Sequence, residues 1–103
     1  MKLLPIRTMI GEGEDKQVSL LFSGPRRKIM QITLRRGATL ARHTAAVPIT
    51  VQCLAGSGTF HADDSSELIE LTAGVLLTVE ANVPHEVRSS PSVSILVTQF
   101  TDG

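Results

Sequence analysis

The sequence contains no tryptophan or tyrosine, three phenylalanines and a single cysteine. With one cysteine no intrachain disulfide can form, so the chain does not imply an oxidising compartment. Without tryptophan or tyrosine it lacks the stacking platforms that proteins use to bind single-stranded nucleic acid. These absences predict a cytoplasmic protein that does not bind nucleic acid.

Net charge and long apolar runs are also missing. Ten Lys and Arg residues balance ten Asp and Glu residues, so no overall field draws the chain to nucleic acid or to an anionic membrane. No apolar run approaches the roughly 20 residues that span a bilayer. We therefore expect no membrane partner. The basic clusters at 26–28 and 35–36 are interpreted as solvated surface, which is where most charge runs lie.

The residues that are abundant favour β-structure. Val, Ile and Thr account for 26 of the 103 residues, and β-branched side chains suit pleated, half-buried surfaces. Apolar residues alternate in short segments, with turn residues between them. The predicted strands are 17–22, 29–35, 49–54, 58–62, 67–71, 75–79, 85–88 and 93–100. Residues 64–73 fit a short helix or a turn followed by a strand.

Regularly spaced short strands predict an all-β sandwich or barrel in a single domain over 1–103. Residues 1–16 form an irregular N-terminal segment. Either they are an ordinary edge strand with a loose terminus, or 3–10 or 17–22 extends the sheet of a neighbouring subunit, which would bury an exposed edge. We expect a homodimer.

Two segments have the spacing of a paired motif. In the first, Gly37 is followed after five residues by His43, and Gly56 closes the motif. In the second, Gly74 and the strand VLLTV lead to ANVPHEV, in which Asn82 occupies a turn position that favours positive φ. His85 follows Pro84, and Ser89 ends the motif.

This pattern resembles the two motifs of the cupin family over about 29–100. The resemblance implies a double-stranded β-helix, or jelly-roll barrel, of six to eight strands. Many cupins hold Fe, Mn, Ni, Cu or Zn through three histidines and a glutamate. Carried over by position, His43 and His85 are candidate metal ligands, whereas Ala45 and Ile49 stand where the family has its second histidine and its glutamate.

An incomplete ligand set leaves several roles open for His43 and His85. They could hold a weakly bound divalent metal, act without metal on a ligand, or be hydrogen-bonded structural residues. Cys53 is interpreted as a buried structural cysteine. A hairpin at 56–58 would place His61 near Cys53 as a solvated histidine, while Phe60 faces the core. Glu80 is expected in an exposed turn.

The interior predicted by strand parity is aliphatic. We expect seven inward side chains: Ile49, Val51, Leu77, Val79, Val87, Ile95 and Val97. The candidate ligand pocket is formed by Ala45, Ile49, Val51 and Val87 and suits a small organic molecule.

The leading hypothesis is a small cupin that binds a small-molecule ligand in its barrel and has a degenerate metal site. The alternative is a metal-dependent oxygenase or isomerase using His43 and His85. A third hypothesis, an interaction module, rests on the edge-prone N-terminal strand. The sequence does not decide whether the protein is an enzyme.

Overall fold

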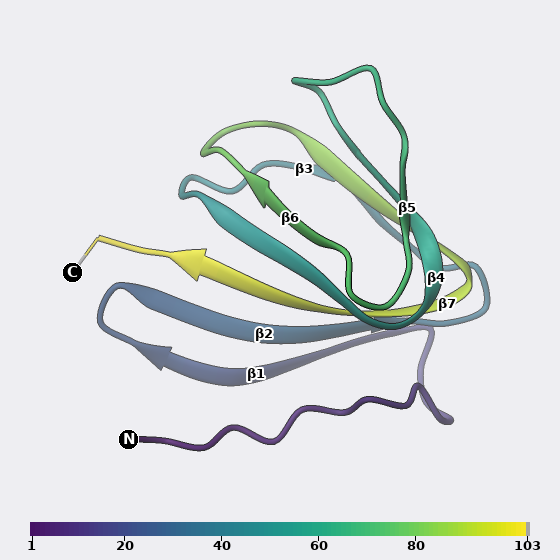
Figure 1. Ribbon diagram of the computed structural model, residues 1–103, viewed down its shortest axis with the longest axis horizontal. Coiled ribbons are helices and arrows are strands. Elements are labelled where there is room, and N and C mark those ends of the chain that lie inside the picture. The colour runs from purple at the N-terminus through teal and green to yellow at the C-terminus, as the bar shows by residue number, and fades with distance from the viewer. Residues whose placement is uncertain (103) are drawn as a thin grey trace.

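The computed structural model describes residues 1–102 and consists of strands joined by turns and loops (Figure 1). The strands are β1 (Lys16–Gly24), β2 (Arg27–Leu34), β3 (Thr39–His43), β4 (Ile49–Ala62), β5 (Ile69–Leu71), β6 (Leu76–Val79) and β7 (His85–Phe100). None of the described residues forms a helix, so none lies in a helix able to cross a membrane. Residues 64–73, for which the sequence fitted either a short helix or a turn followed by a strand, form a turn followed by β5.

Two long strands close the barrel. β4 and β7 pair antiparallel along most of their length, and each changes its second neighbour midway. The first half of β7 pairs with β3 and the second half with β2. β4 pairs with β6 through its first half and with β5 through its second half. The sheet therefore folds over itself with the order β1-β2-β7-β4-β5, and β1 is an edge strand.

The core fills the inner face of this curved sheet. Of the seven side chains predicted to point inward, six are buried, and Leu77 is half-buried against them. Phe60 and Cys53 are also buried, as expected, at 3% and 1% exposure. Each buried aliphatic side chain contributes about 1.5–3 kcal/mol relative to an exposed one. The strand parity read from the sequence is therefore confirmed.

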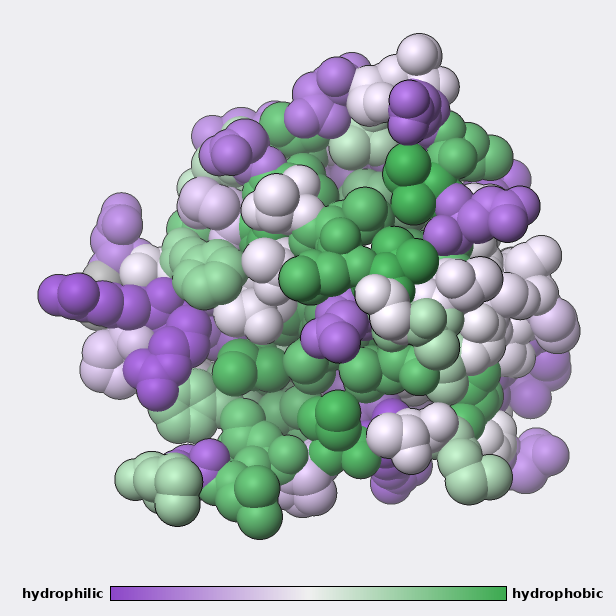
Figure 2. All heavy atoms as spheres, in the orientation of Figure 1, coloured by the Kyte–Doolittle hydropathy of each residue, from purple (hydrophilic) through white to green (hydrophobic). Residues whose placement is uncertain are grey.

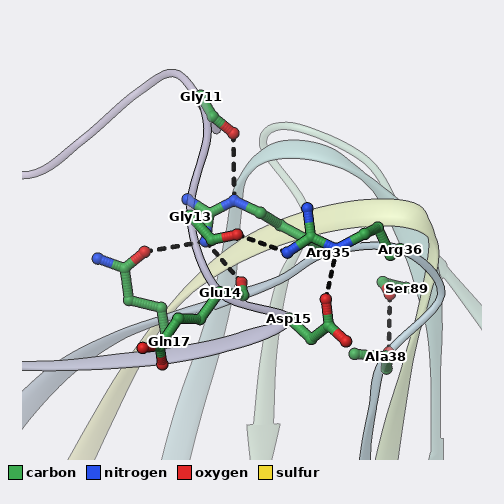
Figure 3. Close-up of polar contacts among 9 residues, drawn as sticks. All are labelled: Gly11, Gly13, Glu14, Asp15, Gln17, Arg35, Arg36, Ala38 and Ser89. Atoms are coloured by element: carbon green, nitrogen blue, oxygen red, sulfur yellow. Dashed lines mark hydrogen bonds and ion pairs between the residues drawn. The ribbon is translucent and has the colours of Figure 1, made fainter.

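The outer face of β2 is covered by the N-terminal segment. The backbone of Arg7 exchanges two hydrogen bonds with the Gln31 side chain, which is itself buried. Arg35, immediately after β2, is only 3% exposed. Its guanidinium donates to the carbonyl oxygens of Ile10, Gly11 and Glu14, and to Gln17 Oε1, at 2.8–3.1 Å. Figure 3 shows these partners except Ile10.

Arg35 therefore corrects the interpretation of the basic clusters as solvated surface. The neighbouring Arg36 does follow that interpretation: it is half-exposed and pairs with Asp15. The two arginines differ because Arg35 directly follows β2 and is buried, whereas Arg36 lies in the next turn, with φ +55°, and is exposed. Arg36 also reaches the N-terminal segment, through Asp15 and the carbonyl oxygen of Gly13, but it does so from an exposed position.

The predicted hairpin at 56–58 was wrong. β4 continues through this stretch, and its register against β7 shifts between Gly56 and Gly58. Gly56 has φ +77°, and a Cβ there would lie 2.2 Å from the carbonyl oxygen of Ser92. The glycines thus allow β4 to bend closely against β7 instead of reversing the chain.

This packing makes Gly56→Ala strongly destabilising. We expect a loss of about 2–5 kcal/mol in the free energy of unfolding, because positive-φ strain and backbone overpacking add. Gly74→Ala is the matched control: its φ is +96°, but a Cβ there meets nothing within 4 Å. That variant should lose about 1–2 kcal/mol from backbone strain alone. If denaturant unfolding shows equal losses of unfolding free energy in the two variants, the close approach of Gly56 to the Ser92 carbonyl is contradicted.

Candidate functional site

A cavity of about 120 Å³ opens inside the barrel. Its lining comes from β2, β3, β4 and β7 and from the loop after β3, and consists of Met30, Ile32, Leu40, His43, Thr44, Ala45, Ile49, Val51, Phe60, His85, Val87, Ile95, Val97 and Gln99. All four candidate pocket residues and both candidate metal ligands are among them. The structure thus brings the six predicted site residues to one cavity, and their roles stay predictions.

The two histidines face each other across β3 and β7. His43 pairs with His85 in the β-ladder, and their ring centroids lie 4.4 Å apart with an interplanar angle of 62°. His85 is 4% exposed and stacks on Phe60 at a centroid distance of 5.8 Å. His43 is exposed. One ring of the pair is therefore exposed to solvent and the other is buried.

Backbone carbonyls fix the tautomer of both rings. His43 Nδ1 lies 2.8 Å from the carbonyl oxygen of Ala41, and His85 Nδ1 lies 2.9 Å from that of Val83. A carbonyl oxygen only accepts hydrogen bonds, so each Nδ1 must carry the hydrogen. In a neutral ring, Nε2 then keeps its lone pair. This arrangement suits a metal or a hydrogen-bond donor at Nε2.

Burial lowers the pKa of His85. The nearby His43 lowers the pKa further, while the hydrogen bond to the Val83 carbonyl opposes the shift. The unfolded chain, with a His pKa of 6.5, therefore takes up a proton at a higher pH than the folded protein does. The contribution of the neutral His85 to folding stability is therefore fully present above pH 6.5. It is lost as the pH falls through the lower pKa of the folded state.

The corresponding prediction compares the wild type with His85→Gln. The amide can still donate to the Val83 carbonyl, but it does not titrate. We expect the stability advantage of the wild type over the variant to shrink as the pH is lowered from neutral through 6.5 and below. Denaturant titrations at several pH values measure this difference. A constant difference across that window would contradict the buried neutral imidazole.

The residues present do not fit a tightly held metal. Among the described residues, no group of three or more His, Cys, Asp or Glu side chains is arranged to bind a metal ion. Ala45 and Ile49 carry no donor atom, so the protein offers two imidazoles. Those fill half of a tetrahedral shell or a third of an octahedral one.

Neither Cys53 nor His61 repairs this ligand set. Cys53 is opposite Ile95 in the ladder, and burial raises the pKa of its thiol, which disfavours the thiolate that metals bind. His61 faces outward because it alternates with the buried Phe60. Its Nδ1 lies 3.0 Å from Arg42, and it pairs with Glu86 rather than lying near Cys53.

Sequence reasoning missed two polar groups of the lining, Thr44 and Gln99. Gln99 has the same parity as Ile95 and Val97, so the alternation within 93–100 could have identified it. Thr44 follows β3, a strand that was not predicted. Glu80 is exposed and Asn82 has φ +65°, both as expected.

Comparison with solved structures places this barrel in a known fold. A cupin superfamily protein from Desulfitobacterium hafniense matches with a TM-score of 0.79 and 20% identity, covering 98% of this chain and 97% of that one. An RmlC-like cupin with a double-stranded β-helix fold from Methanocaldococcus jannaschii matches with a TM-score of 0.78 and 20% identity, covering 97% and 90%.

A conserved protein of unknown function from Streptococcus pyogenes is similar over 100% of this chain and 97% of its own, with a TM-score of 0.77 and 16% identity. No protein-family model matches the chain, and no curated protein matches its sequence significantly. The structural likeness therefore shows the fold. This chain is an all-β protein with the RmlC-like cupin fold, a double-stranded β-helix.

Proposed function

We propose that this protein binds a small, largely apolar molecule in the cavity of its barrel. The observation that carries the proposal is the cavity lining, which combines aliphatic side chains with two facing imidazoles. Small-molecule sites are typically concave and apolar, with a few polar groups that orient the ligand. A dry engineered cavity of about 150 Å³ admits one benzene, so the 120 Å³ here suits a ligand of similar size.

A cavity-filling variant tests this proposal. Ala45 lines the cavity and is half-buried, whereas the neighbouring Ala46 is exposed and does not line it. In a screen of small metabolites, a ligand present at 100 times its Kd should stabilise the wild type by about 2.7 kcal/mol. Ala45→Leu should abolish this shift in melting temperature, and Ala46→Leu should retain it. A ligand shift that survives Ala45→Leu would contradict binding in the cavity.

The second candidate function is a metal-dependent oxygenase or isomerase using His43 and His85. The orientation of both rings favours it, because backbone carbonyls hold each Nδ1 and leave each Nε2 available. The incomplete donor set opposes tight retention. Metal analysis of protein purified without chelator or histidine tag distinguishes the two candidates. Sub-stoichiometric metal that is unchanged in His43→Ala and His85→Ala would overturn the metal enzyme.

We also propose that β1 mediates a homodimer. Val18 and Leu20 are 54% and 59% exposed on this edge strand, opposite Ile32 and Met30 of β2. In Figure 2 apolar side chains extend from the centre of the displayed face to its lower edge; Figure 1 places β1 between the centre and this edge, with the N-terminal segment along the edge itself. Exposed apolar edges tend to pair with another chain.

Sedimentation tests this assembly. Leu20→Glu should dissociate the dimer, while Ser19→Glu, on the opposite face of β1, should have less effect. A wild-type monomer at micromolar concentration would refute the proposal.

A further inference from the structure

The cavity contains no charged residue to balance a charged ligand. Its fourteen lining residues include no Asp, Glu, Lys or Arg. An ion that enters such a site loses hydration without gaining a counter-charge, and this transfer is unfavourable by several kcal/mol. The lining therefore selects a neutral molecule.

The deepest polar group of the lining is a hydrogen-bond acceptor. His85 Nδ1 donates to the Val83 carbonyl, so Nε2 of the neutral ring carries a lone pair. Nε2 has no hydrogen-bond partner among the described residues. In that same part of the chain, every fully buried side-chain nitrogen or oxygen does have a partner. Nε2 must therefore have accessible surface. Because His85 is only 4% exposed and lines the cavity, this surface faces the cavity.

The other polar groups of the lining do not offset the preference for a ligand that donates a hydrogen bond. His43 Nδ1 donates to the Ala41 carbonyl, so this ring also has Nε2 as its remaining nitrogen. Thr44 and Gln99 each supply both a donor and an acceptor, and therefore do not discriminate between ligands. A buried acceptor left without a donor lowers affinity, so a ligand without a donor is disfavoured.

We propose that the cavity recognises a neutral molecule of about benzene size that bears a hydrogen-bond donor such as a hydroxyl group, whose hydrogen is donated to His85 Nε2. This inference rests on the proposed ligand-binding function and specifies its ligand class. The ring or chain of the ligand packs against Val51, Val87 and Ile95, which are buried on the inner face.

The test titrates the full-length protein at neutral pH with phenol and toluene, two probes of matched size. A chelator keeps the imidazoles free of metal. Dissociation constants and binding location come from NMR shifts of the Val51, Val87 and Ile95 methyl groups. Phenol should bind about ten-fold more tightly than toluene, which is the order of one net hydrogen bond. The Nε2 resonance of His85 should move on addition of phenol and stay in place with toluene.

Variants and further probes separate the possible outcomes. His85→Phe should abolish the preference for phenol, and the Nε2 resonance of the wild type provides the same information if that variant does not fold. Equal binding of phenol and toluene in the cavity would overturn the hydroxyl specificity while leaving the ligand-binding proposal intact. Tighter binding of benzoate than of phenol would overturn the selection of a neutral ligand. Binding of none of the three probes would overturn both proposals.

Discussion

The double variant Ala45→His and Ile49→Glu is expected to bind a divalent metal tightly. Both positions line the cavity together with His43 and His85. The two new side chains would bring the donors to three imidazoles and one carboxylate, a set that Zn²⁺ and Ni²⁺ bind well. We expect the affinity for Zn²⁺ to rise by roughly 100-fold or more over the wild type, because two protein donors replace waters in the shell. Competition with a chromophoric chelator measures this change.

A matched double variant provides the control. Ala46→His with Ile49→Glu adds the same two side chains, but Ala46 is exposed and lies off the cavity lining. It should gain far less affinity. Unchanged metal affinity in the Ala45 variant, with the β-sheet circular dichroism intact, would mean that the two motifs are assigned to the wrong positions.

Arg35→Met is expected to destabilise the protein by about 3 kcal/mol. The variant leaves the carbonyl groups of Gly11 and Glu14 (Figure 3) and of Ile10 without their buried charged donor, and hydrogen bonds to charged groups contribute about 1.5–3 kcal/mol each. Water reaches the freed carbonyl groups only if the N-terminal segment separates from β2. Amide exchange and proteolysis within 1–15 should therefore increase together with the loss of stability.

Arg36→Met is the control for this prediction. Arg36 is 55% exposed, pairs with the exposed Asp15 and donates to the carbonyl oxygen of Gly13, and such solvent-exposed contacts contribute little. Its loss should change stability by no more than about 0.5 kcal/mol. Similar effects of the two substitutions would show that Arg35 does not hold the N-terminal segment.

Most of the barrel could be predicted from the sequence because its inner face has period two. In β7 the buried apolar side chains Val93, Ile95 and Val97 alternate along the strand, although Ser94 between them is also buried. The motif spacing named His43 and His85 together, and the structure places them opposite each other on β3 and β7. The turn at Asn82 was predictable because few residues other than glycine adopt its positive φ.

Two parts of the fold carry no such local signal. β3 is a short strand with one half-buried side chain, Leu40, so it shows no alternation of apolar residues. Arg35 is buried by carbonyl groups more than twenty residues away in the chain. A local pattern of charged residues cannot reveal partners at that separation.

The candidate site was predictable in its residues but not in its hydrogen bonding. The spacing of the motifs identified His43 and His85 and the missing donors at Ala45 and Ile49. The orientation of the rings depends on the carbonyl groups of Ala41 and Val83. Those contacts arise from backbone conformation, which side-chain spacing does not specify.

The most direct test of the central claim, that this cupin barrel is a small-molecule pocket with a degenerate metal site, is a crystal structure with anomalous data. The protein should be purified without chelator or histidine tag. We predict an organic ligand or water next to His85 Nε2, without a fully occupied anomalous scatterer. An anomalous peak at full occupancy, about 2.0–2.1 Å from Nε2 of both His43 and His85 as in zinc sites, would contradict the claim.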